Sequence, residues 1–123
     1  MALFDYTSFR IMEQGINLLS QQQNIIAQNI ANQDTPDYKC KYLYFAGVLK
    51  EQMDKEGVPT GKKRLELEST VYVDENTKAQ PDGNNVDSDT QQALFAKNAI
   101  QYEAIIKQMN SEFNMMRTAM SRQ

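Results

Sequence analysis

The chain contains no histidine and no tryptophan, and Cys40 is its single cysteine among 123 residues. Without histidine it lacks the commonest general base and the commonest metal ligand. One cysteine excludes an intrachain disulfide and a clustered thiolate site for a metal. Lys39 and Lys41 flank Cys40 and would favour its thiolate, yet we expect only a bystander thiol on the surface. These absences predict a protein that is not an enzyme and that holds no cofactor and no metal.

Long apolar runs are also missing, and none approaches the roughly 20 residues that a bilayer-spanning helix needs. The N-terminus carries Asp5 and Arg10 and lacks the pattern of a cleavable signal peptide. A net charge of −3 with scattered basic residues gives no support for nucleic-acid binding. These signals alone predict one domain, without membrane insertion, that stays where it is made.

Apolar residues do recur at heptad spacing from Asp5 to Asn32, which predicts a long amphipathic helix. Gly15 weakens this prediction slightly, because glycine costs a helix about 1 kcal/mol relative to alanine. Pro36 pushes Thr35 out of the α region and predicts that the helix has ended by that point. The seam of this helix consists of Phe9, Met12, Ile16, Leu19, Ile26 and Ile30.

The heptad pattern returns after Asp87 and continues almost to the end of the chain, with no charged residue on its seam. Asp87 or Asp89 can cap the start of this second helix. Glu103 and Lys107 are spaced to form an ion pair on its solvent side. The seam of the second helix consists of Phe95, Ala99, Tyr102, Ile106, Met109, Phe113, Met116 and Met120.

Between the two helices the chain reads as a polar, partly β insert. Leu65–Glu68 and Val71–Val73 alternate apolar and polar residues and could pair with each other as a hairpin. The run Asp82–Asn85 is a strong turn signal. An isolated hairpin is marginal in water, so we expect the insert to lean on the helices or on partners.

The predicted fold is therefore mainly α, with two long amphipathic terminal helices that pair as a coiled-coil-like unit and a small extended or β-hairpin insert. We divide the chain into residues 1–36, 37–86 and 87–123. Each helix keeps apolar residues that the other cannot cover, and association with other copies or partners would bury them. The pattern suits a self-associating structural subunit, and it also suits a cytoplasmic helical adaptor or secretion chaperone.

One stretch, NIANQDTPDYK at Asn29–Lys39, resembles the N-terminal signature of the flagellar rod, hook and hook-filament junction protein family. The segments Asp82–Asp89, Asn98–Glu103 and Phe113–Arg117 are similar to the C-terminal signature of the small proximal rod members. Asp37 stands where the family usually has glycine, so a positive φ at this position would be tolerated less comfortably. The motif residues that this chain shares are Asn29, Asn32, Asp34, Thr35, Pro36, Tyr38, Asp82, Gly83, Asn84, Val86 and Asp87.

The resemblance implies a structural subunit of the proximal rod of the bacterial flagellar basal body, which self-assembles through its terminal helices. It implies a place in the periplasmic part of the rod and export by the flagellar type III apparatus without a cleaved signal peptide. The implied partners are other copies of the chain, other rod proteins, the membrane-ring protein with its rod adaptor, and the export apparatus. In related export substrates a Phe-x-x-x-apolar motif engages the export gate, and Phe45 and Leu49 fit it; a buried local turn is the alternative.

Overall fold

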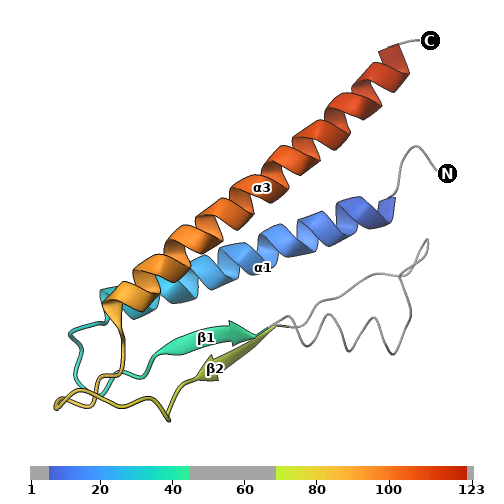
Figure 1. Ribbon diagram of the computed structural model, residues 1–123. Helices are drawn as coiled ribbons and strands as arrows, with labels where there is room; N and C mark the ends of the chain where they lie inside the picture. The colour runs from blue at the N-terminus through green and yellow to red at the C-terminus, as the bar shows by residue number, and fades with distance from the viewer. Residues whose placement is uncertain (1–5, 45–68, 122–123) are drawn as a thin grey trace.

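The computed structural model describes residues 6–44 and 69–121, which form two long helices and a small hairpin (Figure 1). Helix α1 spans Tyr6–Ala31 and helix α3 spans Ser88–Ser121. Strands β1 (Lys41–Tyr44) and β2 (Thr70–Val73) form a two-stranded antiparallel sheet between the helices in sequence. The expected mainly α fold with two helices and a hairpin insert is confirmed.

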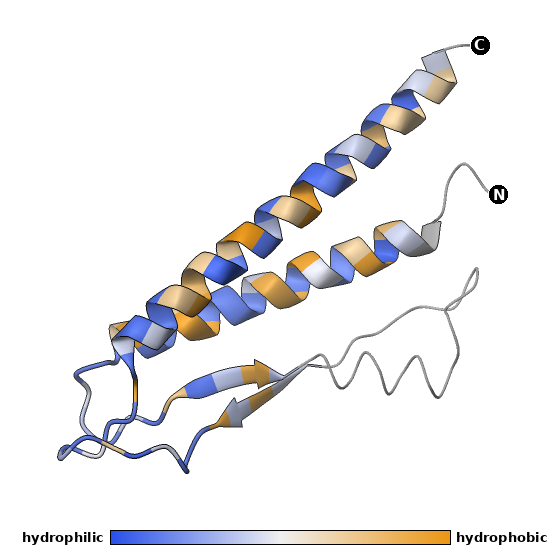
Figure 2. Cartoon of the chain, in the orientation of Figure 1, coloured by the Kyte–Doolittle hydropathy of each residue, from blue (hydrophilic) through white to orange (hydrophobic). Residues whose placement is uncertain are grey.

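Helix α1 is the central layer of the molecule, because it packs against α3 on one side and against β1 on another. Its side chains Leu18, Leu19 and Ile26 are each at most 5% exposed and form most of the small apolar core. Cys40, Leu43 of β1 and Val86, just before α3, complete this core. The segments between α1 and β1 and between β2 and α3 are mostly hydrophilic (Figure 2).

Gly15 lies where the two helices approach each other closely. A Cβ atom at this position would stand 3.3 Å from Cδ1 of Ile105 on α3. Glycine therefore lowers the helix propensity at this position but allows a short distance between the helix axes. The close approach of the helices explains why glycine occurs at position 15, although in the sequence alone it only weakened the helix prediction.

Helix α3 begins with an aspartate cap, as the sequence predicts. The Asp87 carboxylate accepts hydrogen bonds from the Asp89 N–H at 3.1 Å and from the Thr90 hydroxyl at 2.7 Å. These bonds, that of the Thr90 hydroxyl above all, hold the pKa of Asp87 below its usual range. The predicted ion pair between Glu103 and Lys107 is also present, at 3.0 Å on the solvent side.

The hairpin pairs differently from the sequence expectation. Strand β2 covers the predicted strand Val71–Val73, but its partner is β1, with Tyr42 opposite Tyr72. The sequence did not predict β1, although tyrosine and leucine favour strands. The expected partner Leu65–Glu68 lies outside the described residues, as does the proposed export-gate pair Phe45 and Leu49.

Candidate functional site

The shared motif residues from the two ends of the insert meet at one place, which we call the corner and define as residues 29–40 and 82–91. The corner joins the end of α1, the start of β1 and the start of α3. Its three most buried side chains are polar amides, since Asn29, Asn84 and Gln91 are 0% exposed, and a fourth amide, Asn85, is 6% exposed. Buried amides are stable only when they are hydrogen-bonded, so their partners define the geometry of the corner.

Asn29 links three elements through one side chain. Its Oδ1 accepts the Lys41 N–H at 3.0 Å, and its Nδ2 donates to the Lys41 carbonyl at 2.7 Å. Nδ2 also donates to Oε1 of Gln91 on α3 at 3.0 Å, and the Tyr38 hydroxyl donates to Oδ1 at 3.2 Å. Asn29 thus holds β1 against α1 in the way that a neighbouring strand would.

Asn84 fastens the turn after α1 to the segment that leads into α3. Its Nδ2 donates to the carbonyls of Asn32 and Thr35, both at 2.8 Å. Its Oδ1 accepts the Val86 N–H at 2.8 Å, and its own N–H donates to the Asp82 carboxylate at 3.0 Å. Both polar atoms of this side chain are therefore used inside the corner, and the Asn84 carbonyl accepts the Gln80 N–H at 2.7 Å.

Asn85 ties both strands to the same corner. Its Oδ1 accepts the Cys40 N–H and its Nδ2 donates to the Asp74 carbonyl, both at 2.6 Å. The Asn85 N–H donates to the Tyr38 carbonyl at 3.3 Å. Consecutive asparagines thus bind the turn after α1 and the base of the hairpin.

Two residues at the corner have positive φ angles. Asp37 has φ of 59° and Gly83 has φ of 85°. The Asp37 N–H donates to the Asp82 carbonyl at 3.0 Å, so this conformation is part of the contact between the two segments. Asp37 therefore has the positive φ that, if required, would make aspartate less comfortable than glycine at this position.

Cys40 corrects a sequence expectation, because it is buried and 1% exposed. Gln91 Nε2 donates to its sulfur at 3.3 Å. Burial raises the pKa of Cys40, and the hydrogen bond with Cys40, together with burial, raises the pKa of Tyr42 to about 12. The expectation of a bystander thiol on the surface is wrong about the surface, and burial opposes the thiolate that the flanking lysines would favour. Lys39 instead donates to the Gly83 carbonyl, and Lys41 lies over the Tyr38 ring.

The other motif residues lie at the surface of the corner. The Thr35 hydroxyl donates to Oδ1 of Asn32 at 3.1 Å, and Asn32 donates to the Gln28 carbonyl at 2.8 Å. Asp34 and Pro36 are exposed. Across the described ranges, no group of three or more Cys, Asp or Glu side chains is placed to hold a metal ion. The chemistry of the corner is therefore hydrogen bonding between segments.

Sequence reasoning missed two amides on α3. Gln91 reaches Asn29, and Asn98, which is 2% exposed, donates to the Leu19 carbonyl at 3.1 Å and to Gln22 at 3.0 Å. Both lie on the α3 face that packs on α1. An asparagine or glutamine next to an apolar seam ordinarily indicates a solvent-facing position, so the sequence carried no signal for their burial.

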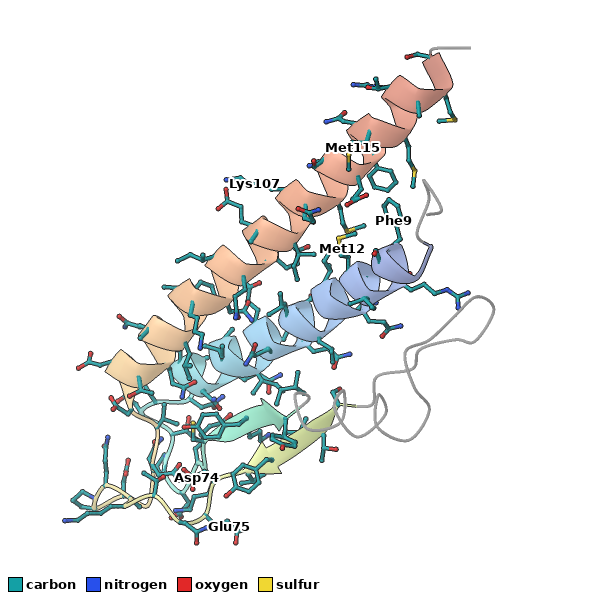
Figure 3. All side chains as sticks on the ribbon, turned by 45° about the vertical axis from the view of Figure 1, so that its right-hand side comes forward. Phe9, Met12, Asp74, Glu75, Lys107 and Met115 are labelled. Carbon is teal, nitrogen blue, oxygen red and sulfur yellow. The ribbon has the colours of Figure 1, made fainter. Side chains whose placement is uncertain are left out.

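The predicted seam of α1 faces the interior of the molecule. Leu19 and Ile26 are buried, whereas Phe9, Met12, Ile16 and Ile30 are half-buried. Phe9 and Met12 point from α1 toward α3 (Figure 3). The Phe9 ring lies 5.0 Å from the Phe113 ring, centroid to centroid.

The predicted seam of α3 is turned partly away from α1. Phe95 is 38% exposed, Phe113 52% and Met120 66%, and Ala99 is exposed as well. The other seam residues are half-buried: Tyr102, Ile106, Met109 and Met116. None of the helices in the described ranges has the length and apolar content to cross a membrane.

Comparison with known proteins shows which family the chain resembles. A family model described as "Flagella basal body rod protein" matches residues 9–39, which include most of α1 and the first half of the corner. The chain is 32% identical over 127 residues to the flagellar basal body rod protein FlgB of Bacillus subtilis, with 98% of each chain covered. It is 31% identical to FlgB of Salmonella typhimurium and 29% identical to FlgB of Escherichia coli, with 89% of each chain covered.

The paired helices, the corner and the matched signature define a flagellar basal body rod protein, a structural component of the flagellum. Within that class, the chain belongs to the FlgB family. The corner supplies a physical reason for the signature, because its asparagines, its turn and its glycine hold three distant segments together.

Proposed function

We propose that this chain is a subunit of the proximal rod that self-assembles through its terminal helices. The observation that carries the proposal is that apolar seam residues of α3 stay exposed while polar amides on the same helix are buried. The helix buries the amides Gln91 and Asn98 on its α1 side, yet Phe113 and Met120 are 52% and 66% exposed. A monomer whose helix had no further partner would favour the opposite arrangement, because apolar side chains gain by leaving water.

We call the uncovered seam residues of this helix the α3 stripe. Because they recur at heptad spacing, their shape suits another helix as the covering partner. The longer α3 also extends beyond α1, since it has 34 residues against 26. At 1.5 Å per residue this difference is about 12 Å. The α3 stripe consists of Phe95, Ala99, Phe113 and Met120.

The partners in this proposal are other copies of the chain, other rod proteins, and the membrane-ring protein with its rod adaptor. The place of action is the part of the rod in the periplasmic space. The chain reaches it through the flagellar type III export apparatus, without a cleaved signal peptide, and Phe45 and Leu49 engage the export gate. The family membership and the α3 stripe support assembly, and the sequence motif supports export.

A charge on the α3 stripe tests the proposal. Met120→Glu places a carboxylate in the proposed interface, whereas Ser111→Glu places one two and a half turns away, on the opposite face of α3. Both positions are exposed, so each change should alter the unfolding free energy by less than about 0.5 kcal/mol. We expect cells with Met120→Glu to lose swimming and rod assembly, while cells with Ser111→Glu swim. Equal swimming by both variants would contradict the proposal.

The alternative is a cytoplasmic helical adaptor or secretion chaperone, whose partner helix would cover the same α3 stripe. Location separates the two functions. A rod subunit is recovered in purified basal bodies, whereas an adaptor stays in the cell extract. Replacing both Phe45 and Leu49 with alanine should shift the chain from basal bodies to the extract without lowering its synthesis. Recovery of the unaltered chain in the extract alone would favour the adaptor.

A further inference from the structure

The hairpin register determines which backbone groups face outward. The Asp74 N–H donates to the Cys40 carbonyl at 2.8 Å, which marks one hydrogen-bonded pair of the ladder. Bonded and non-bonded pairs alternate in an antiparallel sheet, so Val73 and Val71 fall in non-bonded pairs. The N–H and C=O groups of these two valines therefore point away from β1, toward the outer edge of β2.

The two outer edges of the hairpin differ in whether their backbone groups are hydrogen-bonded. At the outer edge of β1, the Lys41 N–H and C=O are both bonded by the Asn29 side chain. In the part of the chain that the structure describes, β1 is the only strand paired with β2. Strand β2 also lies on the side of the hairpin away from α1 (Figure 1). The Asn29 side chain thus covers backbone groups on the edge that faces α1, whereas no other strand among the described residues pairs with the opposite edge.

The open edge lacks the features that usually discourage strand addition. Thr70–Val73 contains no charged residue and no proline, and its side chains are β-branched or aromatic. Val71 is 51% exposed, Tyr72 49% and Val73 39%. Such a strand is a template for a further strand, because its unpaired backbone groups and its apolar side chains are accessible together.

Charge distinguishes the two ends of this edge. Asp74 and Glu75 follow β2 directly and lie on the side of the hairpin away from the helices (Figure 3). The Thr77 hydroxyl and the Asn76 N–H donate to the Asp74 carboxylate and lower its pKa, so the group stays charged. Ser69, at the other end of β2, is neutral.

We propose that the outer edge of β2 docks an extended segment of a different protein chain as an antiparallel third strand. The segment carries uncharged β-branched residues opposite Val71 and Val73 and a lysine or arginine opposite Asp74. Its backbone completes the hydrogen bonds of the two valines, and its basic residue meets the acidic end of the edge.

A second copy of β2 is a poorer occupant of this edge. Antiparallel self-pairing centred on Tyr72 would set Asp74 against the neutral Thr70 of the other copy, without a basic partner. Parallel self-pairing in register would set the Asp74–Glu75 pair against its own copy, and like charges directly opposite destabilise a sheet. Charge complementarity therefore favours a different chain.

Backbone amide exchange tests the site with the full chain and the acetylated, amidated peptide KVTVT. Saturating peptide should slow exchange at the Val71 and Val73 amides by about tenfold or more, because both gain a hydrogen-bond partner. Exchange at Tyr72 should not change, since its N–H already faces β1. The control peptide, methylated on both valine nitrogens, should have no effect. EVTVT should bind more weakly than KVTVT, because its glutamate faces Asp74.

A chain variant supplies an independent control. Val71→Pro removes an outward N–H but no ladder bond with β1, so it should abolish the effect of the peptide, whereas Val71→Thr should retain it. Amide exchange at Val71 and Val73 could instead slow without peptide as the chain concentration rises. That result would assign the edge to a second copy and overturn the proposal. No slowing with millimolar KVTVT, or equal slowing with the methylated peptide, would also overturn it. Met120→Glu should keep peptide binding, so this proposal and helix-mediated assembly fail separately.

Discussion

At the scale of single residues, the corner depends on amide side chains because an amide both donates and accepts. Asn29 can therefore bond the N–H and the C=O of Lys41 at once, as a strand would. A carboxylate or a hydroxyl of similar size lacks this combination of two donors and an acceptor. The sequence singled out Asn29 and Asn32 as motif residues. It could not predict Gln91 as a partner, since 62 residues separate it from Asn29.

The contact between Gly83 and Asp37 gives a prediction at this scale. A Cβ atom on Gly83 would collide with the Asp37 carboxylate, and Gly83 has φ of 85°. We expect Gly83→Ala to lower the unfolding free energy by about 2 kcal/mol, of which roughly half is the cost of a left-handed alanine. Urea unfolding at neutral pH measures this change.

A double-mutant cycle isolates the collision. Asp37→Gly removes the carboxylate and suits φ of 59°, so the cost of Gly83→Ala in that background should fall to about 1 kcal/mol. Asp34→Gly, at an exposed position of the same turn, is the matched control and should leave the cost unchanged. Strict additivity of Gly83→Ala and Asp37→Gly would show that the two residues do not interact.

At the scale of elements, hydrophobic periodicity is a good predictor of where a helix forms. It is a poorer predictor of which neighbours each face of the helix contacts. The heptads placed both helices within a few residues of their observed ends. The face of α3 that packs on α1 is nevertheless rotated from the apolar seam, so that Asn98 is buried while Phe113 is half-exposed. A seam records the sum of all contacts of a helix, including those with partners, and the sequence does not separate them. The same limit applies to β1, whose partner β2 is far away in sequence.

The close approach of α1 and α3 at Gly15 gives the prediction at this scale. Gly15→Ala adds a methyl group 3.3 Å from Cδ1 of Ile105, the mobile end of a side chain. That side chain borders a groove of about 390 Å³, so it has room to move. We expect Gly15→Ala to raise the unfolding free energy by about 0.5 kcal/mol through its higher helix propensity. Chemical denaturation of the purified chain measures the change.

A larger side chain at the same position should have the opposite effect. Gly15→Leu overfills the contact and should lower the unfolding free energy by about 2 kcal/mol. Ile105→Ala in the Gly15→Leu background makes room and should recover part of that loss. If alanine and leucine both stabilise the chain by similar amounts, helix propensity alone acts at Gly15 and the helices are not in close contact there.

At the scale of the whole molecule, the corner sets the direction of the hairpin relative to the helices. The core is small and lies along α1, so apolar packing fixes the helix pair better than it fixes the hairpin. The hairpin is instead held by the polar bonds of Asn29 and Asn85 at its base. Directional hydrogen bonds fix an angle, which apolar contacts do less well. In the proposed assembly that angle would decide where the exposed edge and faces of the hairpin meet neighbouring subunits.

A substitution at Asn84 tests whether the direction of the hairpin matters for assembly independently of helix formation. Asn84→Ala removes one of the two donors to each of the carbonyls of Asn32 and Thr35 and leaves the buried Val86 N–H without its acceptor, which should lower the unfolding free energy by about 3 kcal/mol. The helix signal in circular dichroism should persist at low temperature, because α1 and α3 keep their own contacts. Swimming and rod assembly should fall much further than that signal, since the corner no longer holds one geometry. Asn24→Ala, the same change at an exposed position of α1, should spare both. A loss of swimming that only matches the loss of helix signal would reduce the corner to an ordinary helix stop.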